Sequence, residues 1–319
     1  MSDASAPIVP PKKSRGPLIA AIVIAVAAVL AIVLVVVNLA KPADAPGAEG
    51  GPELGSPENP VQIGTVGAGD PYWATFADAA EAEGISVELV DFGDYAQPNP
   101  ALAEGELDLN QFQHIIYLAQ YNVSSGEDLQ PIGATAIYPL GLYSKQYDSA
   151  ESIPDGSTVA IPDDPANLAR ALLVLQSAGL VELTETSPFI TLDAVDEGAS
   201  RVEVTTLAAA QTAIALDDVA ASVINNDFIE DAGLEASDAI AQDDPSDPAA
   251  LPYVNIFASR ADDVDSEVLN KLVEIYQNSQ EVLDGVQTAS GGTAVFLTTP
   301  KADLQASLVE VEKATAEAE

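Results

Sequence analysis

Residues 158–178 of the chain read TVAIPDDPANLARALLVLQSA, in which a strand pattern passes directly into a helix pattern. Residues 158–161 are β-branched or apolar, which predicts a strand, and Asp164 and Pro165 then provide an N-cap and a first helical residue. From Leu168 onward the helix is apolar on nearly every side, so we expect it to be buried on most of its surface. A strand that leads directly into a buried helix is the repeating unit of an α/β fold with a parallel sheet.

The same strand–helix alternation is predicted on both sides of this stretch. We expect strands over residues 61–66, 85–90, 107–110, 129–137, 158–161, 201–207, 220–224 and 253–259. We expect helices over residues 71–83, 100–104, 113–123, 165–178, 208–216 and 266–279, and a solvated helix with a frayed tip from residue 301. Repeated units of this kind build mostly parallel sheets with helices on both faces. Because more than 250 residues are too many for one small sheet, the sequence predicts two α/β lobes with a cleft between them.

A long apolar run lies near the N-terminus. Leu18 to Val37 is twenty residues without a polar side chain, which as a helix spans about 30 Å, the thickness of a bilayer core. Three basic residues precede the run, and this places the N-terminus in the cytoplasm by the positive-inside rule. We therefore expect a cytoplasmic stub over residues 1–16, a transmembrane helix over residues 17–39, and an extracytoplasmic remainder.

A cleaved signal peptide is the alternative for this run, and the chain would then be secreted. The run is longer than the usual apolar core of a signal peptide, and the small-x-small site at residues 43–45 is followed by Pro46. A lipid anchor is not expected, since the chain has no cysteine to acylate. Residues 40–60 alternate proline and glycine without apolar periodicity, which predicts a linker.

The charge of the chain excludes several classes of function. After residue 41 it holds 49 of the 50 acidic residues and 7 of the 11 basic ones, a net charge of −42, which argues against nucleic acid as a partner. The lack of cysteine excludes disulfides and thiolate metal sites, and a single histidine excludes paired-histidine metal motifs. No nucleophile elbow, phosphate loop or dinucleotide fingerprint is present. We expect no enzymatic activity, no metal and no cofactor.

Because basic residues are scarce, Arg170 is the most informative of them. It shares one face of its predicted helix with Asn167, and a buried guanidinium needs an anion as its partner. That partner is either a structural acidic residue or the carboxylate of a ligand, and the pattern leaves both open.

Three further side chains are candidates for a binding site. His114 is predicted to lie one helical turn from Tyr117, with Phe112 at the start of the same helix, and it either lines a pocket or packs as a core histidine. Asn225 ends a predicted strand, and Asn255 is expected inside the apolar strand at residues 253–259. A buried amide must be hydrogen-bonded, to backbone or to a ligand.

These residues lie in stretches that resemble the NlpA/MetQ family of solute-binding proteins, the methionine receptors of ABC importers. The match extends over roughly residues 60–297. It is carried by DYAQPN (94–99), LAEGELD (102–108), FQH (112–114), YL (117–118), YP (138–139), GLYSK (141–145), VAIPDDPANL (159–168), Arg170, SVIN (222–225) and PYVN (252–255).

The resemblance implies a type II, periplasmic-binding-protein-like fold of two lobes that closes on its ligand. Lobe 1 would comprise residues 61–137 plus 256–319, and lobe 2 residues 138–255. The ligand would be a small amino acid, with L-methionine expected, delivered to an ABC permease with its ATPase. Arg170 would hold the carboxylate, Asn225 and Asn255 the polar end with the ammonium, and Tyr95, Phe112, His114 and Tyr117 would enclose the side chain.

The sequence also departs from the family pattern. Ile115 and Ile116 stand where a basic–proline pair is usual, and a predicted membrane helix stands where relatives carry a lipid. The alternatives are therefore a receptor for another amino acid or a short peptide, a surface α/β hydrolase, and a structural or adhesive surface protein.

Overall fold

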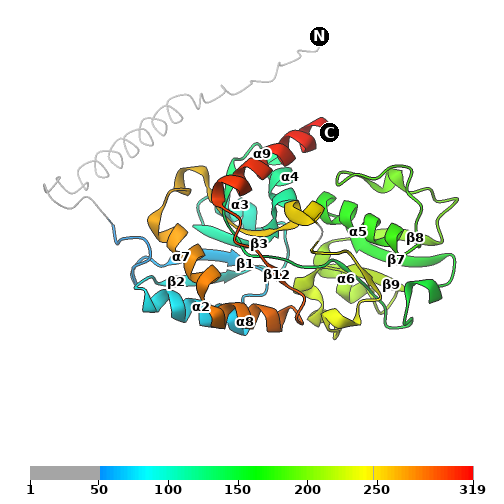
Figure 1. Ribbon diagram of the computed structural model, residues 1–319, viewed down its shortest axis with the longest axis horizontal. Coiled ribbons are helices and arrows are strands. Elements are labelled where there is room, and N and C mark those ends of the chain that lie inside the picture. Colours follow the sequence, from blue (N-terminus) through cyan, green and yellow to red (C-terminus); the bar gives the residue numbers. More distant parts are fainter. Residues whose placement is uncertain (1–50, 247, 319) are drawn as a thin grey trace, which may run out of the picture. The chain divides into compact units, whose positions relative to one another are not determined.

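Two five-stranded sheets carry the fold in the computed structural model, which describes residues 51–246 and 248–318 (Figure 1). The first sheet has the order β2–β1–β3–β11–β4. Its strands are β1 (Val61–Thr65), β2 (Val87–Asp91), β3 (Leu109–His114), β4 (Leu129–Ala134) and β11 (Asn255–Arg260). Strand β1 pairs in parallel with β2 and β3, whereas β11 pairs antiparallel with β3 and β4. Four of the five strands therefore run in one direction, as the repeated strand–helix units predict.

The second sheet repeats this arrangement in the order β10–β6–β9–β7–β8. Its strands are β6 (Gly141–Tyr143), β7 (Ser157–Pro162), β8 (Val202–Leu207), β9 (Ala221–Ile224) and β10 (Ala241–Gln242). Strand β7 pairs in parallel with β8 and β9, and β6 pairs antiparallel with β9 and β10. A small antiparallel ladder joins β5 (Ala136–Ile137) to β12 (Val295–Phe296).

Helices flank both sheets. The α-helices are α2 (Pro71–Ala82), α3 (Pro98–Ala103), α4 (Ile115–Ser125), α5 (Pro165–Ser177), α6 (Ala209–Ala215), α7 (Glu267–Asn278), α8 (Gln280–Ala289) and α9 (Lys301–Ala318). Short 3₁₀ turns are η1 (Ala150–Ser152), η2 (Leu192–Ala194), η3 (Asn226–Phe228), η4 (Glu230–Ala232), η5 (Ala236–Asp238), η6 (Pro248–Tyr253) and η7 (Ala261–Asp263). Figure 1 shows α2, α7 and α8 beside β1 and β2, and α5 and α6 beside β7 and β9.

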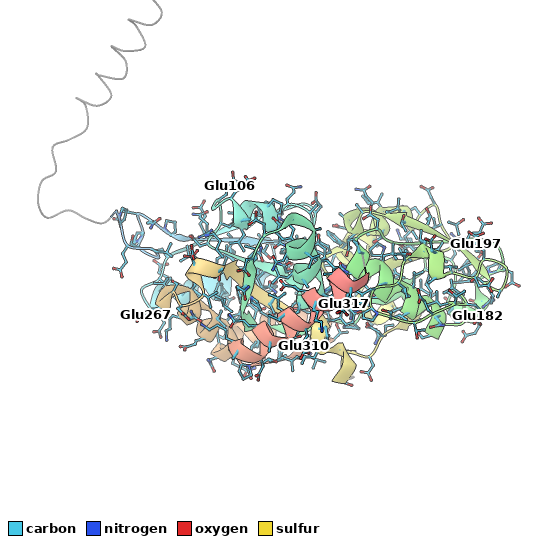
Figure 2. All side chains as sticks on the ribbon, turned by 90° about the horizontal axis from the view of Figure 1, so that it is seen from above. Glu106, Glu182, Glu197, Glu267, Glu310 and Glu317 are labelled. Atoms are coloured by element: carbon cyan, nitrogen blue, oxygen red, sulfur yellow. The ribbon has the colours of Figure 1, made fainter. Side chains whose placement is uncertain are left out.

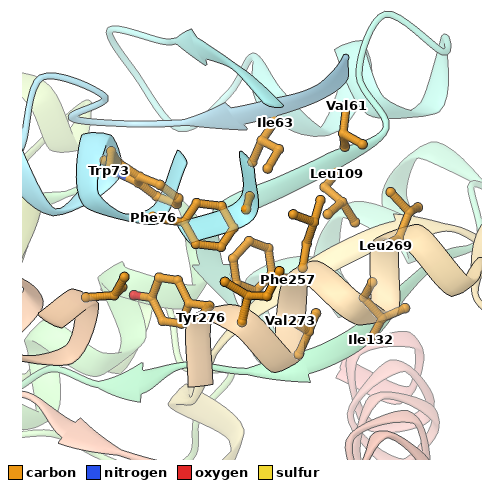
Figure 3. Packing of buried hydrophobic residues seen from close by; sticks show 14 of the residues in the cluster. Val61, Ile63, Trp73, Phe76, Leu109, Ile132, Phe257, Leu269, Val273 and Tyr276 are labelled. Atoms are coloured by element: carbon orange, nitrogen blue, oxygen red, sulfur yellow. The ribbon is translucent and has the colours of Figure 1, made fainter. Parts of the chain in front are cut away.

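Apolar side chains of the first sheet pack on both of its faces, and β11 shows this within one strand. Phe257 of β11 enters a cluster with Phe76 of α2 and Tyr276 of α7 (Figure 3). Its neighbours in the strand, Ile256 and Ala258, enter a separate cluster to which α4 and α9 contribute. Successive side chains of one strand point to opposite faces, so both clusters are fixed by a single run of apolar residues.

Most predicted elements are confirmed to within two residues at each end, and the differences come from long-range pairing. Strand β3 continues to His114, which pairs with Asn255 of β11, so the following helix begins at Ile115 and not at residue 113. The strand predicted over residues 129–137 breaks at Thr135, whose N–H and hydroxyl both donate to the carbonyl of Asn255. Asn255 is the first residue of β11 and half-buried, not an interior strand residue as predicted.

Two further differences concern elements that the sequence pattern did not predict and the burial of the terminal helix. Strand β6 and helix α8 have no counterpart in the prediction. The terminal helix α9 is not a freely solvated helix, because Leu304, Leu308 and Val311 are buried against the rest of the fold.

The described chain passes between the two sheets twice. The outgoing connection leads from β5 through Tyr138 and Leu140 to β6, and the returning connection leads from β10 through η6 to β11. The predicted cytoplasmic stub, the transmembrane helix over residues 17–39 and residues 40–50 of the linker lie outside the described residues. Within residues 51–246 and 248–318, no helix has the length and apolar composition needed to cross a bilayer.

Candidate functional site

A cavity lies where the carboxyl ends of strands from both sheets meet, which is where α/β sheets usually bind ligands. All seven residues predicted from the sequence line it: Tyr95, Phe112, His114, Tyr117, Arg170, Asn225 and Asn255. The sequence analysis did not select several other residues of the lining, among them Gln113, Tyr138, Asn226 and Asp227. A second cavity adjoins the first and shares Phe112, Tyr138, Asn226, Asp227 and Asn255 with it.

Arg170 is held in place by both connections between the sheets. Its helix α5 begins at Pro165 and is capped by Asp164, whose carboxylate accepts from the N–H of Asn167, as the sequence predicts. The Arg170 side chain is buried, with Nε donating to Asp243 at 2.6 Å and Nη2 donating to the carbonyl of Tyr138 at 2.8 Å. Asp243 also accepts from the N–H of Leu140, so one carboxylate joins the two connections to the guanidinium. These bonds leave Nη1 without a hydrogen-bond partner among the described residues.

The structural acidic partner considered in the sequence analysis is therefore present, and Arg170 still lines the cavity. The guanidinium carbon also lies 4.5 Å from the centroid of the Tyr253 ring, a cation–π contact that fixes its plane. The result is an oriented cation with donor capacity left for an anion.

The sequence predicts His114 inside a helix, and this prediction is wrong. The residue is the N-cap of α4 and comes just before the helix. Its Nδ1 accepts from the N–H of Tyr117 at 3.2 Å, so in the neutral imidazole Nε2 carries the proton, and Nε2 lies 3.4 Å from Oδ1 of Asn167. Burial, with the nearby charge of Arg170 adding to it, lowers the pKa of His114 to about 3. The side chain is therefore a neutral donor at physiological pH and not a charged group.

Three aromatic rings form one wall of the cavity. The ring centroids of Tyr95, Phe112 and Tyr117 lie 5.7 to 6.2 Å apart, and the Tyr117 hydroxyl donates to the carbonyl of Tyr95 at 2.9 Å. Tyr95 is also 5.1 Å from the ring of Phe228, which follows β9 of the second sheet. Interlocked rings of this kind give a rigid apolar surface for a ligand side chain.

A buried amide network supports this wall from behind. Gln113 and Asn99 exchange two hydrogen bonds of 2.7 and 2.6 Å, and Asn110 bonds to both of them. The three amides fix strand β3 against α3, and so fix the positions of Phe112 and His114 on either side of Gln113. This network was not predicted from the sequence, because its members come from two short elements, Asn99 from α3 and the other two from β3.

Asn225 presents an unused acceptor. The residue is only 9% exposed, its Nδ2 donates to Oδ1 of Asn167 at 3.0 Å, and its Oδ1 has no hydrogen-bond partner among the described residues. Burying an acceptor without a donor costs free energy. A ligand group that donates a hydrogen bond to this oxygen would remove that cost and bind more tightly.

Asp227 is the most prominent residue that the sequence analysis missed. Its Oδ2 accepts from the hydroxyl of Tyr95 at 2.7 Å, which joins the loop after β2 in the first sheet to η3 after β9 in the second. The residue as a whole is exposed, yet its carboxylate faces the cavity, where loss of hydration, with the charge of Asp70 adding to it, raises the pKa of Asp227 to about 6. Nothing in the sequence distinguishes it from the other 49 acidic residues.

The chain is similar to members of the NlpA lipoprotein family. The model of the NlpA lipoprotein family matches residues 61–296. The D-methionine-binding lipoprotein MetQ of Salmonella typhi is 38% identical over 244 residues, which are 74% of this chain and 88% of that protein.

Solved structures agree with this match. Protein PG110 from Staphylococcus aureus has a TM-score of 0.75 and 32% identity, and the alignment covers 79% of this chain and 99% of that one. A nutrient binding protein from Burkholderia cenocepacia bound to methionine has a TM-score of 0.69 and 37% identity, covering 74% and 99%.

Proposed function

Since the chain belongs to the NlpA lipoprotein family, we propose that it is the extracytoplasmic substrate-binding component of an ABC importer and that its ligand is methionine. The observation that carries this proposal is the cavity, around which all seven predicted residues gather from both sheets. The Salmonella relative is named for D-methionine and the Burkholderia structure contains methionine, which supports the choice of ligand. Such a component binds and hands over its ligand without catalysing a reaction.

The residues of the cavity suit a zwitterion with an apolar side chain. Arg170 receives the carboxylate through the donors that its bonds to Asp243 and Tyr138 leave available. Asn225, whose Oδ1 has no donor among the described residues, and Asn255 receive the ammonium. Tyr95, Phe112, Tyr117 and His114 enclose the side chain, with His114 as a neutral donor.

Binding would proceed by closure of two lobes, residues 61–137 plus 256–319 and residues 138–255. Ligand contacts to both lobes stabilise the closed arrangement and shift the population toward it. The chain would be held at the membrane by the apolar run over residues 17–39, with the folded part outside and next to a permease and its ATPase. Fractionation of cells expressing the full chain tests the anchor: release into the medium would favour cleavage of the run.

The ligand assignment is tested by calorimetry on the full chain in detergent, titrated with L-methionine, D-methionine and the other amino acids. Arg170→Ala should weaken methionine binding by about tenfold or more, about 1.4 kcal/mol. Arg201→Ala is the matched control, because that arginine pairs with Asp155 at the surface and does not line the cavity. Equal affinities of Arg170→Ala and wild type would contradict the carboxylate assignment. A protein that binds none of the amino acids would contradict the proposed function.

A further inference from the structure

The cavity holds more acceptor capacity than the described side chains use. Oδ1 of Asn225 has no donor, although the residue is 9% exposed. Two residues further along, Asp227 accepts from the hydroxyl of Tyr95 at Oδ2 and from the side chain of its neighbour Asn226. A carboxylate offers about four acceptor positions, so part of the acceptor capacity of Asp227 stays available.

Asp227 also lacks a counter-ion. Among the described residues, no lysine, arginine or histidine forms an ion pair with it, and the one arginine that lines the cavity, Arg170, pairs with Asp243. The charged group that raises the pKa of Asp227 is another acid, Asp70, at the edge of the adjoining cavity. A carboxylate in these surroundings is stabilised by any cation that enters the cavity.

We propose that Asp227 is a ligand-contacting residue that accepts hydrogen bonds from the ammonium group of the ligand, together with Oδ1 of Asn225 and the amide of Asn255. This inference rests on the proposed function and deepens it by adding an anionic partner to the two amides. The ammonium then lies where the two cavities meet, since Asp227 and Asn255 line both. An ammonium supplies three donors, which suits one carboxylate and two amide oxygens.

Tyr95 acquires a second role from this arrangement. Its ring belongs to the aromatic wall, and its hydroxyl fixes Oδ2 of Asp227 at 2.7 Å. Tyr95 follows β2 of the first sheet and Asp227 follows β9 of the second. Their hydrogen bond can therefore orient the carboxylate only while these two segments are close together. Arg170 and Asp227 thus give the site one group for each charge of an α-amino acid.

The test compares Asp227→Asn with wild type, using methionine and its desamino analogue 4-(methylthio)butanoate in calorimetry on the full chain at about pH 7.5. The variant keeps the size of the side chain and an oxygen for the Tyr95 hydroxyl. Methionine should bind at least about tenfold more weakly to the variant, whereas the analogue, which lacks the ammonium, should bind both proteins equally. Asp231→Asn is the matched control, an exposed acid nearby that does not line the cavity.

A second measurement follows methionine affinity between about pH 5 and pH 8 and does not depend on binding of the analogue. The titratable groups around Asp227 are Asp70, Tyr72, Tyr95, Tyr138 and Tyr276. The four tyrosines have raised pKa values, so they stay neutral in this range. In wild type the affinity should fall as the pH drops through the pKa of Asp227, because the protonated acid no longer attracts the ammonium. In Asp227→Asn the profile should be flatter than that of wild type, because the part of the fall that Asp227 causes is gone. Burial also raises the pKa of Asp164, the N-cap of α5, to about 6, and its contribution should be the same in both proteins.

The possible outcomes distinguish a failure of the role proposed for Asp227 from a failure of the proposed receptor function. Equal methionine affinity of variant and wild type, or parallel pH profiles, would overturn the role of Asp227 and leave the receptor function intact. Equal weakening for methionine and the analogue would also overturn it, since Asp227 would then act on the fold and not on the ammonium. Failure of the wild type to bind methionine would instead contradict the proposed function itself.

Discussion

Arg170 shows what a single residue in the sequence can and cannot predict. Its place in a buried helix of a chain with few basic residues was enough to select it. Whether its anion was a structural acid or a ligand could not be predicted, because the answer depends on Asp243, 73 residues away. The structure shows the structural acid, since Asp243 fixes the guanidinium, and Arg170 also lines the cavity in which we propose the ligand carboxylate to bind.

His114 offers a direct measurement at the residue scale, because it is the only histidine in the chain. Burial lowers its pKa to about 3, so its imidazole should remain neutral, with the proton on Nε2, from about pH 7.5 down to about pH 5. Long-range ¹H–¹⁵N correlation spectra of labelled protein report the tautomer and the charge. Denatured protein is the control, where the pKa should return to about 6.5. A midpoint near 6.5 in the folded protein would contradict the buried position of the ring.

The boundary between β3 and α4 shows that the ends of an element are predicted less well from the sequence than the residues of the site. Residues 113–123 have a helical pattern, but the first two of them form strand pairs with β11, about 140 positions away in the chain. The same pairing moves Asn255 to the start of its strand. Local periodicity predicted that these elements exist, and long-range hydrogen bonds decided where they begin.

Helix α9 was predicted to be solvated because its composition is mixed, yet it packs against α4 and β4. Asn122 of α4 also donates to Glu312 of α9 at 2.8 Å. Leu308→Ala should lower the free energy of unfolding by about 2–5 kcal/mol, since the side chain is fully buried. Val309→Ala, at a position that is 63% exposed, should change it by less than about 0.5 kcal/mol. Urea unfolding measures both, and similar losses for the two variants would show that α9 is not docked as described.

Each sheet contains one strand that runs against the other four. At the scale of the whole molecule, this strand results from the two passages of the chain between the sheets. Each passage delivers one strand against the direction of its neighbours: β6 after the outgoing connection, and β11 after the returning one. The sequence predicted the strand–helix repeats but not this exchange, because short antiparallel strands such as β6 carry no strong pattern. Arg170 bonds to both connections, so the proposed carboxylate site lies beside the segments that would act as a hinge between the proposed lobes.

Closure around that hinge can be measured because the chain has no cysteine, so spin labels attach only where cysteine is introduced. Glu106 and Glu197 are exposed and belong to the proposed lobes 1 and 2, respectively (Figure 2). In Glu106→Cys/Glu197→Cys, methionine should shift and narrow the distribution of label distances measured by pulsed electron resonance, since the ligand selects the closed state. The pair Glu106→Cys/Glu267→Cys has both labels on the proposed lobe 1 and should give the same distribution with and without ligand. If the first pair were also unchanged by saturating methionine, the ligand would bind without closure, and the two lobes would not move as separate bodies.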